Sequence, residues 1–285
     1  MRPRPGVAYR RRPPPGGRGR LGRCASPARR LDVSPGRTGH IVGVMKWEAM
    51  LSGHVFDLED LPLYFDTDPH VLAEGERYWL ISSAFDQMQD VVQVQEASRV
   101  VVARINGAMR LEDSGFEGVH LSGRYRNETG EHVVVGAGTA VGRAKAGMVT
   151  VAGGTPSPRP PGPREYVQLS GTDLAAADVL RIISKGDLDW YDLYKIFEIV
   201  REDIGGERVM TAKGWAVASD LSAFRVSANH PGVSGQSARH ARQNPGTPKH
   251  TMTIGRGRAF IAHLVRSWMT LRLSPPGNPP PIQDP

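Results

Sequence analysis

The chain has 285 residues, of which 39% are hydrophobic, which is enough for one or two packed domains and too many for a wholly disordered protein. Residues 1–40 hold eleven of the 36 basic residues and one of the 29 acidic residues, so the rest has 25 basic against 28 acidic side chains and a net charge of −3. The charge of +7 on the whole chain therefore says little about partners of the folded part. Because Cys24 is the only cysteine, internal disulfides and cysteine-ligated metal sites are excluded.

The first 44 residues are rich in Arg, Pro and Gly and contain almost no large apolar side chain. Such a segment cannot bury enough surface to offset the entropy of ordering, so we expect a disordered basic tail over 1–44. Met45 begins the first segment with a regular pattern of apolar residues, and we predict that the natural protein starts at this residue. The alternative is a basic arm that binds RNA or membrane phosphates, but only Tyr9 could stack on bases.

Membrane association is not indicated by the sequence. No apolar run approaches the roughly 20 residues that span a bilayer, and the arginine-rich start is followed by Pro and Gly where a signal peptide is apolar. We therefore expect no membrane partner and a cytoplasmic location.

Residues 45–154 are mostly typical of strands. Polar and apolar residues alternate in 46–51 and 119–125, and 77–82 reads Arg-Tyr-Trp-Leu-Ile-Ser, which is also typical of a strand. The turn residues of Asn127–Gly130 predict a hairpin. A helix is predicted between 86 and 110 by apolar residues at helical spacing, which are Val94, Ala97, Val101, Ile105 and Ala108. We expect a small antiparallel α+β domain in which this helix packs on the sheet.

Residues 155–163 contain five prolines, which exclude a central strand or helix and favour a stiff spacer. We therefore predict a Pro-rich linker over 155–164 and a loose tail over 274–285. Between them the period is helical, with helices expected near 165–184, 189–204, 217–229 and 253–271. The predicted fold class is a multidomain α and β protein whose second domain, 165–273, is an all-α four-helix domain.

Three patterns could indicate a cofactor or a metal. The glycines of 136–142 imitate a dinucleotide fingerprint, but no crossover helix fits before the linker, so a glycine-rich hairpin is favoured. The acids between Asp57 and Asp68 could hold a hard cation, although solvated turns and caps are favoured. His230, His240 and His250 lack nearby carboxylates. We therefore expect neither a cofactor nor a metal.

The clearest predicted helix spans 189–204, and two of its polar residues lie beside its apolar face. Tyr194 and Arg201 could lay their apolar stems on the core and keep their tips in water. The alternative is that they line a groove together with residues 221–242. The last helix also has a broad apolar face, for which core packing is the default and a homodimer contact is the alternative.

Residues 221–242 hold the densest set of chemically useful side chains. Leu221, Phe224 and Ala228 form a helical stripe with Arg225 beside it, and the residues Asn229-His230-Pro-Gly end the helix. This break in the helix could bring the His230 ring beside the Arg225 side chain. In the alternative interpretation, Asn229 and Ser234 cap and turn the chain while His230 is solvated, as are Arg239 and Arg242.

A four-helix domain with Arg225-x-x-x-x-His230 after a helix resembles the HEPN (higher eukaryote and prokaryote nucleotide-binding) domains, many of which are ribonucleases of toxin and defence systems. The resemblance would cover 165–273. It implies metal-independent action on RNA, with Arg225 binding phosphate and His230 serving as acid or base. Arg239-His240 with Arg242 resembles the Arg-His ending of some HEPN-like domains, which makes His240 a second catalytic candidate.

The leading hypothesis is therefore a binding or sensing module joined to a HEPN-like domain that binds or cleaves RNA. In addition to Arg239 and Arg242, RNA-contacting residues would be Arg201, Tyr194 and Asn229. The alternative is a non-catalytic scaffold whose helical domain dimerises or docks a partner protein.

Overall fold

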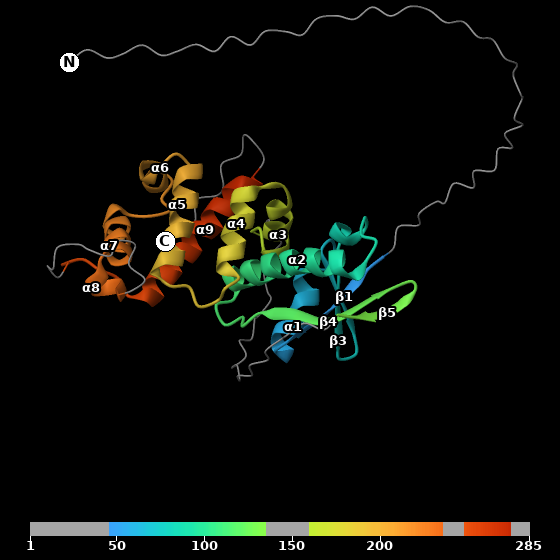
Figure 1. Cartoon of the computed structure of the whole chain (residues 1–285). Coiled ribbons are helices and arrows are strands. Elements are labelled where there is room, and N and C mark those ends of the chain that lie inside the picture. Colours follow the sequence, from blue (N-terminus) through green and yellow to red (C-terminus); the bar gives the residue numbers. More distant parts are fainter. Residues whose placement is uncertain (1–45, 135–159, 236–247, 275–285) are drawn as a thin grey trace, which may run out of the picture. The chain divides into compact units, whose positions relative to one another are not determined.

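The computed structural model describes residues 46–134, 160–235 and 248–274 (Figure 1). These residues all belong to one compact unit, Gly43–Pro285. Its first half contains the strands β1 (Glu48–Gly53), β2 (His70–Glu74), β3 (Arg77–Ile81), β4 (Val119–Asn127) and β5 (Gly130–Val133), and the helices α1 (Val55–Tyr64), η1 (Ser83–Phe85, a 3-10 helix) and α2 (Val91–Glu112).

The five strands form one antiparallel sheet in the order β2-β3-β1-β4-β5. Ala49 lies opposite Leu80 on one side and Tyr125 on the other, and all three are buried on one face. Long helix α2 packs against β1 and β4, as Figure 1 shows. The predicted α+β arrangement is confirmed, and the buried residues of β1 alternate along the strand.

The second half is helical. Its elements are α3 (Pro163–Thr172), α4 (Leu174–Ile183), α5 (Trp190–Asp203), α6 (Glu207–Ala212), α7 (Ala218–Asn229), α8 (Pro231–Ser234) and α9 (Ile254–Leu273). The mixed α and β class is therefore confirmed, whereas a HEPN-like four-helix bundle stays a prediction.

The prediction of a single helix at 165–184 is wrong, because the two helices α3 and α4 lie there. Asp173 has an extended backbone (φ −114°, ψ 110°), and its carboxylate accepts a hydrogen bond from the Ala176 amide at the start of α4. An aspartate cap of this kind favours a new helix start over continuation of the old one. The helical region also begins slightly earlier than expected, because Pro163 takes the first position of α3, where its missing N–H costs nothing.

The two halves meet along α2, which contacts α3 and α4 as well as the sheet. Gly107 lies at the closest approach, since a Cβ placed there would be 2.2 Å from the carbonyl oxygen of Leu180 in α4. The buried side chains of both halves form one continuous cluster. The predicted domain end at 154 lies outside the described residues.

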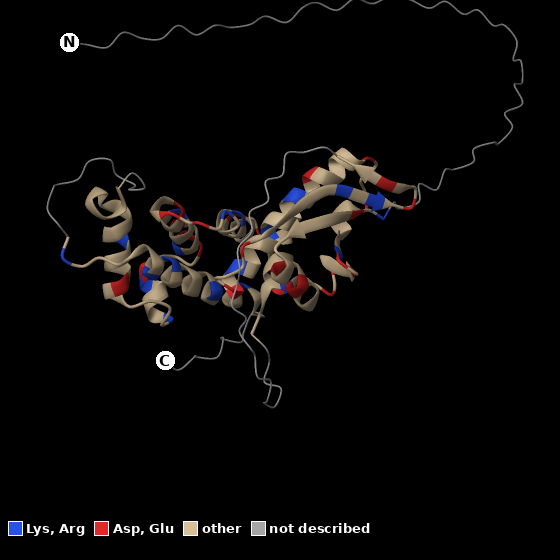
Figure 2. Cartoon of the chain, turned by 90° about the horizontal axis from the view of Figure 1, so that it is seen from below, with Lys and Arg blue, Asp and Glu red and all other residues tan. Residues whose placement is uncertain are grey.

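Figure 2 shows acidic and basic residues interspersed over the helices and strands. This distribution agrees with the small net charge of the chain after residue 40. Within the described ranges, no helix is both long enough and apolar enough to cross a membrane.

Candidate functional site

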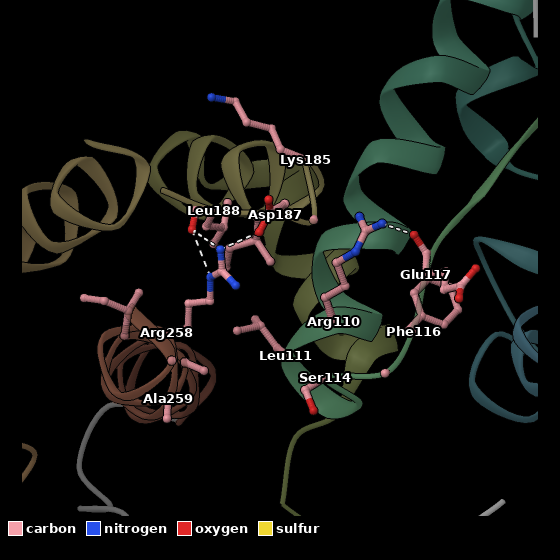
Figure 3. Close-up of a pocket in the computed structure, with 16 residues that line it drawn as sticks. Arg110, Leu111, Ser114, Phe116, Glu117, Lys185, Asp187, Leu188, Arg258 and Ala259 are labelled. Atoms are coloured by element: carbon pink, nitrogen blue, oxygen red, sulfur yellow. Dashed lines mark hydrogen bonds and ion pairs between the residues drawn. The ribbon is translucent and has the colours of Figure 1, made fainter. Parts of the chain in front are cut away.

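A cleft of about 1000 Å³ lies between three segments: the end of α2 with the loop to β4, the α4–α5 loop, and the first half of α9 (Figure 3). Its volume is at the upper end of the range for small-molecule sites. The lining is mainly apolar and includes Leu111, Phe116, Ile183, Leu188 and Ile261. The cationic side chains that line the cleft are Arg110, Lys185 and Arg258.

Arg110 forms part of the cleft wall and is held by main-chain oxygens. Its Nη1 donates to the carbonyl oxygen of Ser184 (2.5 Å), and its Nη2 donates to that of Glu117. Within the described part of the chain, no carboxylate forms an ion pair with this guanidinium. Burial lowers the pKa of Arg110 below its ordinary value, and the nearby charge of Asp57 acts in the opposite direction. Because arginine stays protonated in proteins, the wall carries a half-buried positive charge.

Two glycines leave room for that guanidinium. A Cβ at Gly118 would lie 2.5 Å from Arg110 Nη2, and a Cβ at Gly186 would lie 3.2 Å from the same atom. Both glycines also have positive φ angles, of 111° and 87°, which side-chain-bearing residues rarely adopt. Glycine at these two positions therefore suits the backbone of both loops and leaves space beside the guanidinium.

Two further side chains fix the α2–β4 loop. Asp57 Oδ2 accepts hydrogen bonds from the amides of Glu117 (2.8 Å) and Gly118 (2.9 Å). Asn106 accepts from the Val119 amide (2.9 Å) and donates to the Val119 carbonyl (2.8 Å). Asp57 is 1% exposed, so its expected place in a solvated turn is wrong. Its carboxylate is satisfied by main-chain amides distant in sequence, which no local pattern reveals.

Arg258 lies on the other side of the cleft, on α9. Its Nε and Nη2 donate to the Leu188 carbonyl (2.9 and 2.7 Å), and its Nη2 also pairs with Asp187. Figure 3 shows Arg258 and Arg110 on opposite walls with Leu111 between them, whereas the Lys185 ammonium extends away. That ammonium pairs with Asp192 instead.

The predicted Arg225 and His230 lie at the end of α7 but bind different groups. Arg225 Nη1 is 3.2 Å from Glu207 Oε1 on α6. His230 links α7 to α8, and its Nδ1 accepts a hydrogen bond from the Gly232 amide (3.1 Å). Asn229 donates to the Arg225 carbonyl (2.8 Å). The helix break therefore directs His230 toward α8, and the Arg225 side chain is turned to α6.

Tyr194 and Arg201 contact the core. Tyr194 is 6% exposed, and its ring stacks on Phe224 at a centroid distance of 6.3 Å. The Arg201 guanidinium lies 5.8 Å from the Phe197 ring centroid. The structure thus places the Tyr194 ring inside the helical core, where it cannot stack on a base, because its apolar ring packs better there.

The remaining candidates, Arg239, His240 and Arg242, lie outside the described residues, as do the glycines of 136–142. The described ranges contain no group of three His, Cys, Asp or Glu residues placed to hold a metal. Sequence patterns did not identify Arg110 or Arg258. An arginine in the last turn of a helix, followed eight residues later by glycine, is too common a pattern to indicate the cleft.

Comparison of the chain with protein-family models, with curated proteins and with solved structures gives no match. The resemblance to HEPN domains therefore stays a prediction, and a functional proposal rests on the residues of the cleft and of α7.

Proposed function

We propose that this protein binds a small organic anion in the cleft between Arg110 and Arg258. The observation that carries the proposal is the half-buried guanidinium of Arg110, which has no carboxylate in an ion pair within the described part of the chain. Buried charges in proteins are normally paired, because removing a charge from water is costly. An anionic ligand group would supply the missing partner.

The rest of the lining indicates what the body of the ligand is like. Leu111, Phe116 and Ile261 are each at most 3% exposed and form apolar walls. The surface that faces the cleft is more apolar than polar, so an organic ligand would cover apolar surface that a simple inorganic ion would leave in contact with water. The cleft therefore fits a molecule with an apolar body and an acidic group.

A dye test addresses this proposal. Anilinonaphthalene sulfonate has an aromatic body and one acidic group, and it fluoresces when bound in apolar sites. Ala259 lines the cleft and is exposed, so Ala259→Trp should fill the cleft without disturbing the core. We expect this variant to bind the dye at least about tenfold more weakly than the wild type, a loss of about 1.4 kcal/mol.

The matched control is His263→Trp, an exposed position of α9 that does not line the cleft. Both variants keep the arginines of residues 1–40, so dye bound there contributes equally. Equal dye affinity in Ala259→Trp and His263→Trp, with unchanged circular dichroism, would contradict the proposal.

A second candidate function is metal-independent RNA cleavage at His230. The observation that favours it is the hydrogen bond that His230 Nδ1 accepts from the Gly232 amide, which orients the imidazole ring. An imidazole held in this orientation is suited to proton transfer, and the Arg225 side chain, 46% exposed one turn earlier in α7, would contact phosphate in addition to Glu207. A homodimer formed by the helical half and a cytoplasmic location also stay predictions.

We expect the full chain to cleave labelled single-stranded RNA in the presence of EDTA, and His230→Ala to reduce the rate by about 100-fold or more. His120→Ala removes a half-buried histidine of β4 and should leave the rate unchanged. His240→Ala tests the other histidine. Absence of cleavage by the folded wild type, or full activity of His230→Ala, would rule out this role for His230.

A further inference from the structure

We propose that the ligand of the cleft is an apolar dicarboxylate, with one acidic group bound by Arg110 and the other bound by Arg258 in place of Asp187. This inference rests on the proposed function and adds the chemical class of the ligand.

Arg110 is prepared to bind the first acidic group. A guanidinium carries five N–H groups. Among the described residues, Nη1 and Nη2 each donate one bond, to the carbonyls of Ser184 and Glu117, so further N–H groups are left for a ligand. The two carbonyls and the adjacent Gly118 and Gly186 fix the guanidinium in place. Little side-chain entropy would therefore be lost when a ligand binds.

Arg258 already holds a carboxylate, which indicates what it would bind in a complex. The carboxylate belongs to Asp187, whose side chain is 92% exposed and lies in the α4–α5 loop. An exposed ion pair of this kind contributes little to stability. A ligand carboxylate that also buries an apolar body can therefore replace Asp187 at small cost.

The surface between the two arginines explains why the ligand body should be apolar. Leu111 lies between Arg110 and Arg258 in Figure 3. Ile261 and Ala262 of α9 also line the cleft. The third cation of the lining, Lys185, is turned away and pairs with Asp192. The cleft therefore has an arginine at each end and an apolar middle, and the acidic residues Glu117 and Asp187 also belong to its lining. A molecule with a single acidic group would contact only one of the two arginines.

The test is displacement of anilinonaphthalene sulfonate from the full-length protein by linear dicarboxylates, from succinate to sebacate, and by the monocarboxylates of equal length. We expect at least one dicarboxylate to displace the dye at a concentration about tenfold lower than its monocarboxylate, because it forms one more charge-assisted contact. Arg258→Met should remove this advantage. Arg181→Met, an exposed arginine of α4 away from the cleft, should retain it.

The outcomes separate the two proposals. If each dicarboxylate and its monocarboxylate displace the dye equally in the wild type, while Ala259→Trp still weakens dye binding, the cleft binds anions but the dicarboxylate inference is overturned. If the dicarboxylate advantage persists in Arg258→Met, the assigned second contact is overturned. If Ala259→Trp leaves dye binding unchanged, the proposed function itself fails.

Discussion

Gly107→Ala is expected to lower the free energy of unfolding by about 3 kcal/mol or more. The new Cβ would lie 2.2 Å from the Leu180 carbonyl oxygen and 2.9 Å from Leu180 Cα. These are main-chain atoms of α4, so no side-chain rotation can relieve the clash, and α2 and α4 must move apart. Urea unfolding followed by tryptophan fluorescence measures the change.

Gly171→Ala is the matched control, because Gly171 is exposed in α3 and a Cβ there would have no other atom within 4 Å. Alanine is a better helix former than glycine, so this variant should be unchanged or more stable by up to about 1 kcal/mol. Similar urea midpoints for Gly107→Ala and the wild type would contradict this contact. They would show that α2 and α4 lie farther apart than the 2.2 Å between the new Cβ and the Leu180 carbonyl oxygen implies.

Phe224→Ala is expected to destabilise the protein by about 3–5 kcal/mol. The Phe224 ring is fully buried and contacts four aromatic rings, those of Trp190, Tyr194, Phe197 and Phe260. Truncation removes the side chain through which α7 packs on α5 and α9. The loss includes both the transfer free energy and the cavity that rigid aromatic neighbours cannot fill.

Phe56→Ala provides the comparison, since Phe56 is 47% exposed on α1. Its effect on the free energy of unfolding should be within about 0.5 kcal/mol. A loss below about 1 kcal/mol in Phe224→Ala would contradict the packing of α7 on α5 and α9.

The fold could be predicted where a local period exists. The helix expected between 86 and 110 is α2, whose buried face repeats at helical spacing. The strands expected at 77–82 and 119–125 are β3 and β4, although β3 buries three consecutive residues and so has no single buried face. Elements without such a period were missed, among them α1 and β2. In α1 only Leu58, Leu61 and Asp57 are buried, and Pro62 lies inside the helix, while β2 has a single buried residue, Val71. In neither element do buried residues recur often enough to show a helical or strand period.

The cleft could not be predicted, because its geometry depends on contacts between distant segments. Arg110 meets the Ser184 carbonyl 74 residues away, and Asp57 binds amides 60 and 61 residues away. Arg225 and His230 were identified from their residue types and spacing, which predict chemistry but not orientation. Only the structure shows that Arg225 pairs with Glu207.

The central claim is that cationic groups of the cleft bind the acidic group of an organic ligand. The most direct measurement compares the affinity of the full chain for anilinonaphthalene sulfonate with that for N-phenylnaphthylamine, which lacks the sulfonate. We predict about tenfold tighter binding of the sulfonate, an advantage of about 1.4 kcal/mol that falls in Arg110→Met and persists in Arg181→Met. Equal affinities for the two dyes in the wild type, or an advantage unaffected by Arg110→Met in a variant with unchanged circular dichroism, would contradict this claim.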